Sequence, residues 1–88
     1  MRIEFTATFE RDLEGVTDQR IAERVVSAIE NVRQAKTPHD IHQIKALKGT
    51  DKAYRIRIGE YRLGLYIVGD TVRFVHCLDR KEIYRFFP

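Results

Sequence analysis

The stretch from Ala53 to Cys77, AYRIRIGEYRLGLYIVGDTVRFVHC, decides how this chain folds. Apolar and polar residues alternate with period two across three short runs, which is the pattern of half-buried antiparallel strands. Gly59-Glu60 and Gly69-Asp70 separate the runs, and a glycine at the first central position accepts the positive φ that a two-residue hairpin turn needs. The stretch therefore predicts a three-stranded meander whose register is fixed by its two turns.

The two turns, interpreted separately, predict the same division of the sheet into two faces. Residues that flank a two-residue loop lie opposite each other and share a face, so the first turn pairs Arg57 with Arg62. The second turn places Tyr66 opposite Arg73 on that same face. One face is then apolar. The other face carries four arginines, Arg55, Arg57, Arg62 and Arg73.

The directly opposed Arg57 and Arg62 need an explanation, because like charges that face each other in a sheet cost from a few tenths of a kcal/mol to about 1 kcal/mol. Exposed arginines can extend apart into water, which keeps this cost small. The alternative is that a polyanion such as the RNA backbone neutralises them. The sequence leaves both explanations open.

Upstream of the meander, the sequence predicts one strand and a short helix. Met1 to Ala7 alternates as a strand, with Ile3 and Phe5 on one side. Thr8 is a candidate N-cap for a helix through Leu13, which Gly15 ends.

A longer helix follows the short one. Thr17 or Asp18 caps it, and it runs to about Ala35, with Pro38 barring its continuation. Its apolar positions follow the 3.6-residue period: Ile21, Val25, Ala28, Ile29 and Val32. The two helices form a hairpin whose apolar stripe needs a partner, and the apolar face of the sheet is available.

Two further segments have weaker patterns. Residues 40–49 have apolar side chains at every third position, which suits one short helical turn or an irregular crossing over the core. The tail Asp79 to Pro88, DRKEIYRFFP, has helix-compatible spacing, but it is too short to be stable without docking. Phe86 and Phe87 either pack on the sheet or remain exposed as a contact for a partner.

These elements predict a single domain, residues 1–88, of the α+β class. The expected sheet is small and antiparallel, made of the N-terminal strand plus the three-stranded C-terminal meander. The helical hairpin is expected on one face of this sheet, followed by a short C-terminal tail or helix.

Charge and composition narrow the classes of function. The chain has 16 Lys and Arg against 13 acidic residues, a net charge of +3, which permits nucleic-acid binding without establishing it. Ten of the basic residues lie between Lys45 and the end of the chain, so the basic character belongs to the sheet. No apolar run approaches the roughly 20 residues that span a bilayer. We expect no membrane association and a cytoplasmic location.

Familiar catalytic sets are absent from the sequence. There is no glycine-rich phosphate loop, and the only serine, Ser27, falls in the middle of a predicted helix. Cys77 is the only cysteine, which excludes an intrachain disulfide. His39 and His42 are three residues apart, but no third metal ligand is evident, so we expect no metal and no cofactor.

A lone histidine, His76, invites a general-base role because it precedes a cluster of arginine and tyrosine. The predicted register places it on the apolar side of the sheet, with Val72 and Phe74. This placement favours a structural role for His76.

What remains is a basic surface that bears hydroxyl groups. It comprises Lys52, Arg55, Arg57, Arg62, Tyr66, Arg73, Arg80, Lys81 and Tyr84. RNA carries its own nucleophile, the 2′-hydroxyl, so an enzyme that aligns it with the adjacent phosphate needs no nucleophilic side chain. Arginines would stabilise the charge of the transition state, and a tyrosine could stack on a base or orient the hydroxyl.

Residues 47–84, LKGTDKAYRIRIGEYRLGLYIVGDTVRFVHCLDRKEIY, resemble the core of the RelE/ParE superfamily of type II toxins. The resemblance rests on a K-L-x-G type segment, the double strand Y-R-[IV]-R-x-G-x-Y-R-[LI] and the terminal R-[KR]-[ED]-x-Y. It covers about half of the chain closely, and the order of elements extends it to nearly all. RelE-like members are messenger-RNA interferases that cut codons in the ribosomal A site, whereas ParE-like members poison DNA gyrase.

The resemblance implies roles for eight residues. The catalytic set is Arg62, Arg80 and Tyr84, and the residues that bind RNA or its phosphates are Lys52, Arg55, Arg57, Arg73 and Lys81. Arg80 holds the basic catalytic position of the tail, Tyr84 is the stacking or orienting tyrosine, and Lys81 could exchange roles with Arg80.

The expected function is therefore that of a toxin acting as a ribosome-dependent endoribonuclease on mRNA. The alternative is a gyrase inhibitor without ribonuclease activity. The expected partners are the ribosome with its mRNA and a cognate antitoxin that lays apolar and acidic groups over the toxin. A larger toxin–antitoxin complex on operator DNA, bound through the antitoxin, is also expected.

Overall fold

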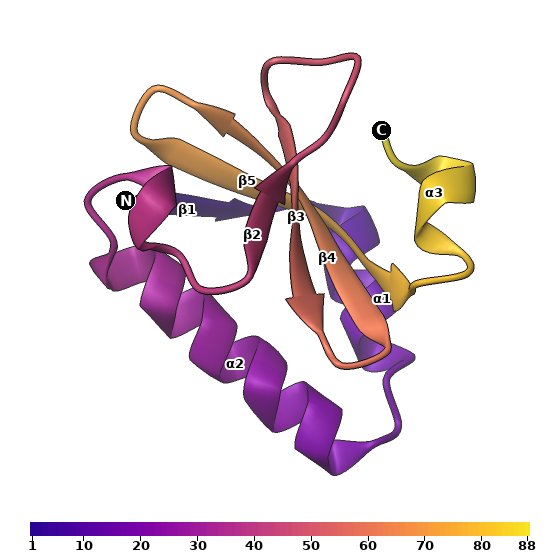
Figure 1. Cartoon of the computed structure of the whole chain (residues 1–88). Coiled ribbons are helices and arrows are strands. Elements are labelled where there is room, and N and C mark those ends of the chain that lie inside the picture. The colour runs from indigo at the N-terminus through magenta and orange to yellow at the C-terminus, as the bar shows by residue number, and fades with distance from the viewer.

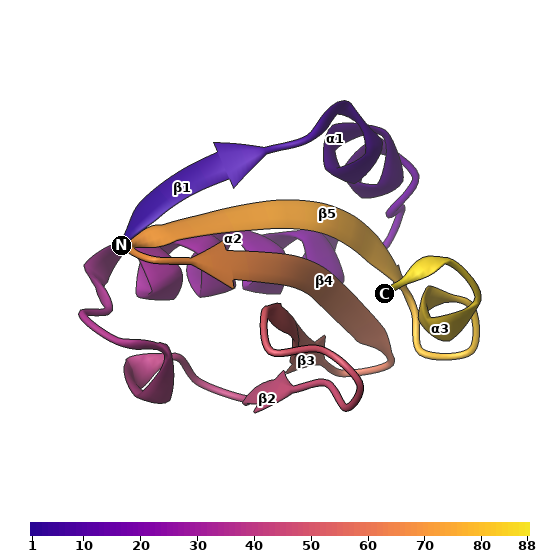
Figure 2. The ribbon, with the colours of Figure 1, turned by 90° about the horizontal axis from the view of Figure 1, so that it is seen from above.

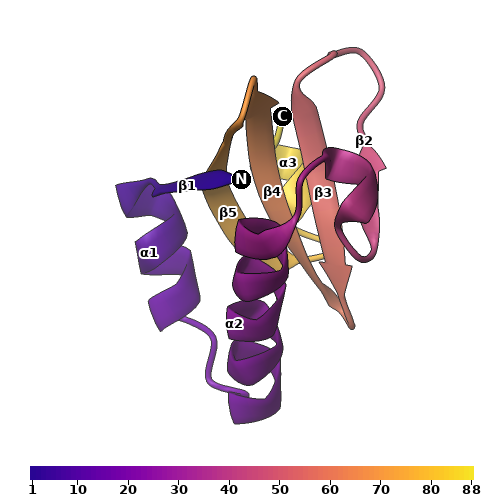
Figure 3. The ribbon, with the colours of Figure 1, turned by 90° about the vertical axis from the view of Figure 1, so that its left-hand side faces the viewer.

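A computed structural model describes residues 1–88, in which a five-stranded sheet carries helices on both faces (Figure 1). The elements in chain order are β1 (Arg2–Phe5), α1 (Ala7–Glu14), α2 (Gln19–Gln34), a 3₁₀ helix (Pro38–Asp40), β2 (Ile44–Ala46), β3 (Ala53–Ile58), β4 (Tyr61–Val68), β5 (Thr71–Asp79) and α3 (Ile83–Phe86). The strand order is β1-β5-β4-β3-β2. Helices α1 and α2 lie on one side of the sheet, and α3 lies on the other (Figure 3). The α+β class is confirmed.

The predicted meander is confirmed in its turns and its pairing. Gly59 and Gly69 have φ of 58° and 60°, the left-handed region that glycine adopts without steric cost. Arg57 pairs with Arg62, and Tyr66 pairs with Arg73. The arginines therefore share the face of the sheet that is turned away from α2, and we call this side the α3 face.

The direction of β1 was predicted wrongly. β1 pairs with β5 in parallel, with Ile3 opposite Val72 and Glu4 opposite Arg73. The sheet is therefore mixed and not antiparallel. Alternation in the sequence sets which residues share a face but carries no information on strand direction. After β1, helices α1 and α2 carry the chain across one face of the sheet (Figure 2). A connection of this length allows β1 to run parallel to β5, which a tight hairpin would not.

The segment at 40–49 was also predicted incompletely. The 3₁₀ helix Pro38–Asp40 lies just before this segment, and the segment itself has no helical turn. It contains instead a fifth strand, β2, which pairs antiparallel with β3 so that Lys45 lies opposite Arg55. β2 has only three residues, which is too few for alternation to be recognised. Gln43 turns the chain into β2 with a φ of 62°.

The helices begin at residues that cap them. Thr6, and not the predicted Thr8, caps α1, because its Oγ1 accepts a hydrogen bond of 3.1 Å from the Phe9 amide. Asp18 caps α2 as predicted, accepting from the Arg20 amide at 2.9 Å. Gly15 ends α1 and Ala35 ends α2, as predicted.

The main core lies between the helical hairpin and the sheet. Its buried residues are Phe9, Val25, Val32, Ala35, Ile41, Ile56, Ile58, Leu63, Leu65, Ile67, Val72, Phe74 and Cys77. The predicted stripe of α2 packs here. None of the helices is both long enough and apolar enough to cross a membrane.

A second, smaller core lies on the α3 face and holds the C-terminal tail. Ala53, Ile83 and Phe87 form it, and Tyr66 packs against them. The Phe87 ring covers Gly64, because a Cβ placed at Gly64 would lie only 2.8 Å from Phe87 Cδ2. Phe86 is 61% exposed. The two alternatives for the tail aromatics are therefore both realised, one by each residue.

A β-bulge at Val75 overturns the predicted placement of His76. Leu65 pairs with Phe74 but Gly64 pairs with His76, so Val75 is an extra residue on β5. Beyond the bulge, alternation shifts by one, and His76 joins Gly64 on the α3 face while Cys77 enters the main core. The sequence prediction assumed unbroken alternation, and that assumption is wrong here.

His76 is nonetheless in a structural setting. Its Nδ1 lies 2.8 Å from Asp12 Oδ2, and the same carboxylate oxygen accepts from the Cys77 amide at 3.1 Å. The imidazole centroid lies 6.3 Å from the ring centroids of both Phe86 and Phe87. Asp12 thus fixes α1 to the bulged end of β5.

Replacing Gly64 with alanine should destabilise the fold, because the new Cβ would overlap the Phe87 ring. Overpacking of this kind costs about 1–3 kcal/mol in the free energy of unfolding. The measurement is urea unfolding of Gly64→Ala in the wild-type chain and in a Phe87→Ala background. In the second background the added methyl should cost less than about 0.5 kcal/mol. Equal costs in both backgrounds would contradict the role assigned to this contact.

Candidate functional site

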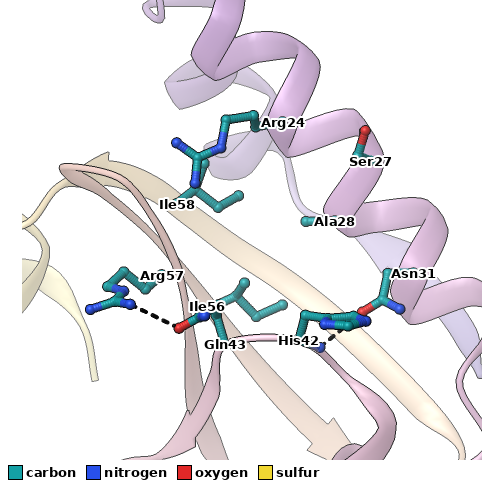
Figure 4. A pocket seen from close by; sticks show the side chains of 9 residues that line it. All are labelled: Arg24, Ser27, Ala28, Asn31, His42, Gln43, Ile56, Arg57 and Ile58. Carbon is teal, nitrogen blue, oxygen red and sulfur yellow. Dashed lines mark hydrogen bonds between the residues drawn. The ribbon is translucent and has the colours of Figure 1, made fainter.

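Gln43 holds two of the arginines on the α3 face. Its backbone oxygen accepts from Arg55 Nη1 and from the Arg57 amide, both at 3.2 Å. Its side-chain Oε1 accepts from Arg57 Nη2 at 3.1 Å (Figure 4). The φ of 62° at Gln43 is costly for a residue with a Cβ. A strained backbone thus presents one residue to two guanidinium groups.

Arg62 and Arg80 both contact the turn between β3 and β4. Arg62 Nη1 donates to the Gly59 oxygen at 2.7 Å and to the Tyr61 oxygen at 2.9 Å. Arg80 Nε lies 2.8 Å from Glu60 Oε2, and the Arg80 amide donates to the Glu60 oxygen at 2.8 Å. These contacts tie the start of the tail to the hairpin turn, so that Arg80 joins Arg62 at one end of the sheet.

Tyr84 is presented to solvent by the docking of α3. Ile83 is buried in the second core, which turns Tyr84, its neighbour, outward with 53% of its surface exposed. Lys81 is exposed in the turn before α3, and its amide donates to Asp79 Oδ1 at 2.7 Å. The phenol is therefore free to contact a ligand.

Arg73 and Lys52 lie apart from the other candidate residues. Arg73 is on β5, next to the edge strand β1, and its Nε lies 3.0 Å from Glu4 Oε1. Lys52 precedes β3 and is exposed at the end of the sheet opposite the β3–β4 turn. The structure thus brings Arg55, Arg57, Arg62 and Arg80 to the β3–β4 side of the α3 face. We call Arg55, Arg57 and Arg62 the arginine groove.

The arginine groove has no carboxylate partner. Arg55 and Arg57 donate to Gln43, which is neutral, and Arg62 donates to backbone oxygens. The five ion pairs of the structure involve none of these three arginines. Three guanidinium groups without a counter-charge attract an anion, and their distribution along two strands suits an extended one.

A pocket of about 260 Å³ opens beside the arginine groove, between α2 and β3 (Figure 4). Arg24 of α2 and Arg57 of β3 both line it, above an apolar floor that includes Ile56. Arg24 has no ion-pair partner and extends the positive charge over the edge of the sheet.

The side chains supply no conventional nucleophile. Burial, reinforced by the negative charge of Asp12, raises the pKa of the Cys77 thiol to about 12, so it stays protonated at neutral pH. No group of three His, Cys, Asp or Glu side chains is placed to hold a metal ion. The site provides positive charge, hydrogen-bond donors from the arginines and an exposed phenol.

Sequence reasoning found the arginines but not the residue that positions them. Gln43 sits in no motif, and glutamine is not a residue that predicts a left-handed backbone. The pairing of Arg73 with Glu4 was also missed, because it depends on the parallel direction of β1. The arginine pattern of β3 and β4 was the only signal in the sequence.

Comparisons with known proteins find a matching family model and similar sequences. Residues 3–84 match the family model of the ParE toxin of type II toxin-antitoxin system, parDE. The chain is 39% identical over 89 aligned positions to Toxin RelE3 of Methanocaldococcus jannaschii, which covers 100% of both chains. It is 33% identical over 55 positions to Putative toxin RelE1 of the same organism, which covers 61% of each.

Solved structures give the same result. The RelB-RelE antitoxin-toxin complex from Methanococcus jannaschii matches with a TM-score of 0.81 and 38% identity, over 97% of this chain and 99% of that one. The YoeB dimer from Staphylococcus aureus matches with a TM-score of 0.71, over 88% of this chain and 93% of that one. At 17% identity, the second match supports the fold alone.

The backbone of Gln43 yields a prediction on stability. Gln43→Gly should leave the free energy of unfolding unchanged or raise it by up to about 1 kcal/mol, because glycine adopts this φ without strain. Gln43→Val should lower it, since a β-branched residue is disfavoured there. Chemical denaturation of the two variants measures both effects. A Gly variant less stable than the Val variant would mean that the Gln43 side chain, and not its backbone, stabilises the turn.

Proposed function

Because the chain belongs to the RelE/ParE superfamily of toxins from type II toxin–antitoxin systems, we propose that it is a ribosome-dependent endoribonuclease that cuts mRNA in the A site. The observation that carries this proposal is the arginine groove, three guanidinium groups without a carboxylate partner, on the face of the sheet where α3 carries the exposed Tyr84. The full-length relative that bears the name RelE3 supports the same assignment.

The proposed reaction uses the 2′-hydroxyl of RNA as its nucleophile. This oxygen attacks the adjacent phosphorus while its proton passes to water, and the bond to the 5′-oxygen of the next nucleotide breaks. The 5′-oxygen takes up a proton from water, so that the products are a 2′,3′-cyclic phosphate and a 5′-hydroxyl. Arg55 and Arg57 hold the flanking phosphates, and Arg62 stabilises the negative charge that develops on the phosphoryl oxygens. Arg80 leaves Glu60 to contribute a further positive charge, since their ion pair is exposed and weak.

Tyr84 positions the substrate in this proposal. Its exposed ring stacks on a nucleobase next to the cleaved bond, which turns the 2′-hydroxyl in line with the leaving oxygen. The groove has no histidine to act as a general base, because the His76 side chain is only 15% exposed and lies against the Phe86 and Phe87 rings. Catalysis at such a site depends on how the RNA is positioned. In this proposal the ribosome positions the codon for cleavage.

The chain also acts with an antitoxin in this proposal. The structures from Methanococcus jannaschii and from Pyrococcus horikoshii are complexes of RelE with RelB. By analogy, an acidic and apolar antitoxin segment would cover the arginine groove here and steer its own association through the positive charge. The larger complex binds operator DNA through the antitoxin.

Variants of the groove test the ribonuclease. Arg62→Ala and Arg80→Ala should each lower the rate of cleavage on translating ribosomes about 100-fold or more, as expected for the loss of a charge that stabilises a transition state. Arg33→Ala is the matched control, because this exposed arginine lies on α2 and pairs with Glu30. Primer extension that maps mRNA 5′ ends gives the measurement.

Two results would contradict the proposal. One is growth arrest without new mRNA ends in cells that express the wild-type chain. The other is inhibition of supercoiling by purified gyrase while mRNA stays intact, which would assign the chain to the gyrase inhibitors.

Tyr84→Phe should keep most of the activity that Tyr84→Ala loses, if stacking is the role of this ring.

A further inference from the structure

Gln43 is the only residue other than glycine that has a positive φ, at 62°. It lies in the turn that leads into β2, and its two oxygens accept hydrogen bonds from Arg55 and Arg57 of the arginine groove. We propose that Gln43 is a positioning residue, whose strained backbone is kept because a neutral side chain of this length holds Arg57 in place for an RNA phosphate. The inference rests on the proposed function, since it takes RNA as the ligand of the groove.

The turn itself does not require a glutamine. A glycine at position 43 would adopt this φ without strain and would present the same backbone oxygen to Arg55 Nη1 and to the Arg57 amide, each 3.2 Å away. The Cβ of glutamine makes this conformation less favourable. The one contact that glycine could not make is the hydrogen bond of 3.1 Å from Arg57 Nη2 to Gln43 Oε1. This side-chain contact is therefore what the strained residue adds.

Length and charge distinguish glutamine from the other residues that carry an acceptor. Asparagine and aspartate enter the left-handed region more readily, but their side chains are one methylene group shorter. Glutamate has the same reach, but its carboxylate would form an ion pair with Arg57 and cancel the positive charge. The ion pair of Arg73 with Glu4, at 3.0 Å, shows this outcome elsewhere on the same face. Glutamine instead orders the guanidinium group and leaves its full charge for an anion.

The turn that carries Gln43 is held on both sides. The Asn31 side chain of α2 accepts a hydrogen bond of 3.0 Å from the amide of His42, the residue before Gln43. Ile44, the residue after it, begins β2 and pairs with β3. Figure 4 shows Gln43 reaching from this turn to Arg57, beside the hollow between α2 and β3. The acceptor Oε1 is thus placed by the fold before any RNA arrives.

The contact leaves Arg57 able to bind a phosphate. Only Nη2 donates to Gln43, so Nε and Nη1 remain free to donate to phosphate oxygens. An arginine that is mobile in the free protein loses conformational freedom when it binds, and this loss weakens the affinity. For one side chain the loss corresponds to a change of about 2- to 10-fold in affinity. A guanidinium group that is already ordered avoids most of this loss.

The direct test measures the affinity of the full chain for a short single-stranded 2′-O-methyl RNA. Gln43→Gly should bind about 2- to 10-fold more weakly, although its free energy of unfolding is equal to that of the wild-type chain or higher. Gln43→Glu should also bind more weakly, and its slope of log K against log salt should be shallower by about 0.7, because one guanidinium group is neutralised. Gln19→Glu is the matched control, since it adds the same charge at the exposed start of α2.

NMR relaxation of the arginine Nε–H groups gives a readout that does not depend on RNA. Arg57 should be ordered in the wild-type chain and more mobile in Gln43→Gly, whereas Arg33, which pairs with Glu30 on α2, should be unchanged. A role confined to the stability of the turn would not change the mobility of Arg57. Equal mobility of Arg57 in the two chains, or equal affinity for the RNA, would overturn the inference.

The outcomes separate this inference from the proposed ribonuclease. If Gln43→Gly weakens RNA binding but the wild-type chain cuts no mRNA on translating ribosomes, the ribonuclease is refuted and the positioning role stands. If the wild-type chain and Gln43→Gly cut mRNA at the same rate and bind RNA equally, the positioning role alone is refuted.

Discussion

The contact of the Phe87 ring with the bare backbone of Gly64 is the constraint on which the α3 face depends. Any side chain at position 64 would displace the ring, which is 2% exposed and anchors α3 together with Ile83. By docking here, the tail lies next to the arginine groove, because Gly64 pairs with Arg55 across β3 and β4.

Much of the fold followed from local patterns in the sequence. The two glycine turns fix the register of β3, β4 and β5, and the 3.6-residue stripe fixes the face that α2 buries. The failures share one physical cause, which is that they depend on contacts between distant segments. The bulge at Val75 appears as unbroken alternation in the sequence, and the parallel direction of β1 leaves no pattern at all.

The sequence predicted the candidate site about as completely as it predicted the fold. Alternation alone placed Arg55, Arg57 and Arg62 on one face, but it could not show which of the basic residues have partners. Arg73 and Arg80 are paired with carboxylates, whereas the arginines of the groove are not. This difference decides which basic residues are free to bind an anion. Gln43 accepts hydrogen bonds from two of the groove arginines. Its strained backbone could be recognised only from the folded structure.

The central claim is that the arginine groove binds RNA through its phosphates. The most direct test is the affinity of the full chain for a short 2′-O-methyl RNA, which cannot cleave itself, measured over a range of salt concentrations. If three phosphates are neutralised, log K should fall against log salt with a slope of about −2. Replacing Arg57 by alanine should make this slope shallower by about 0.7. An affinity independent of salt, or a slope unchanged in the variant, would contradict the account.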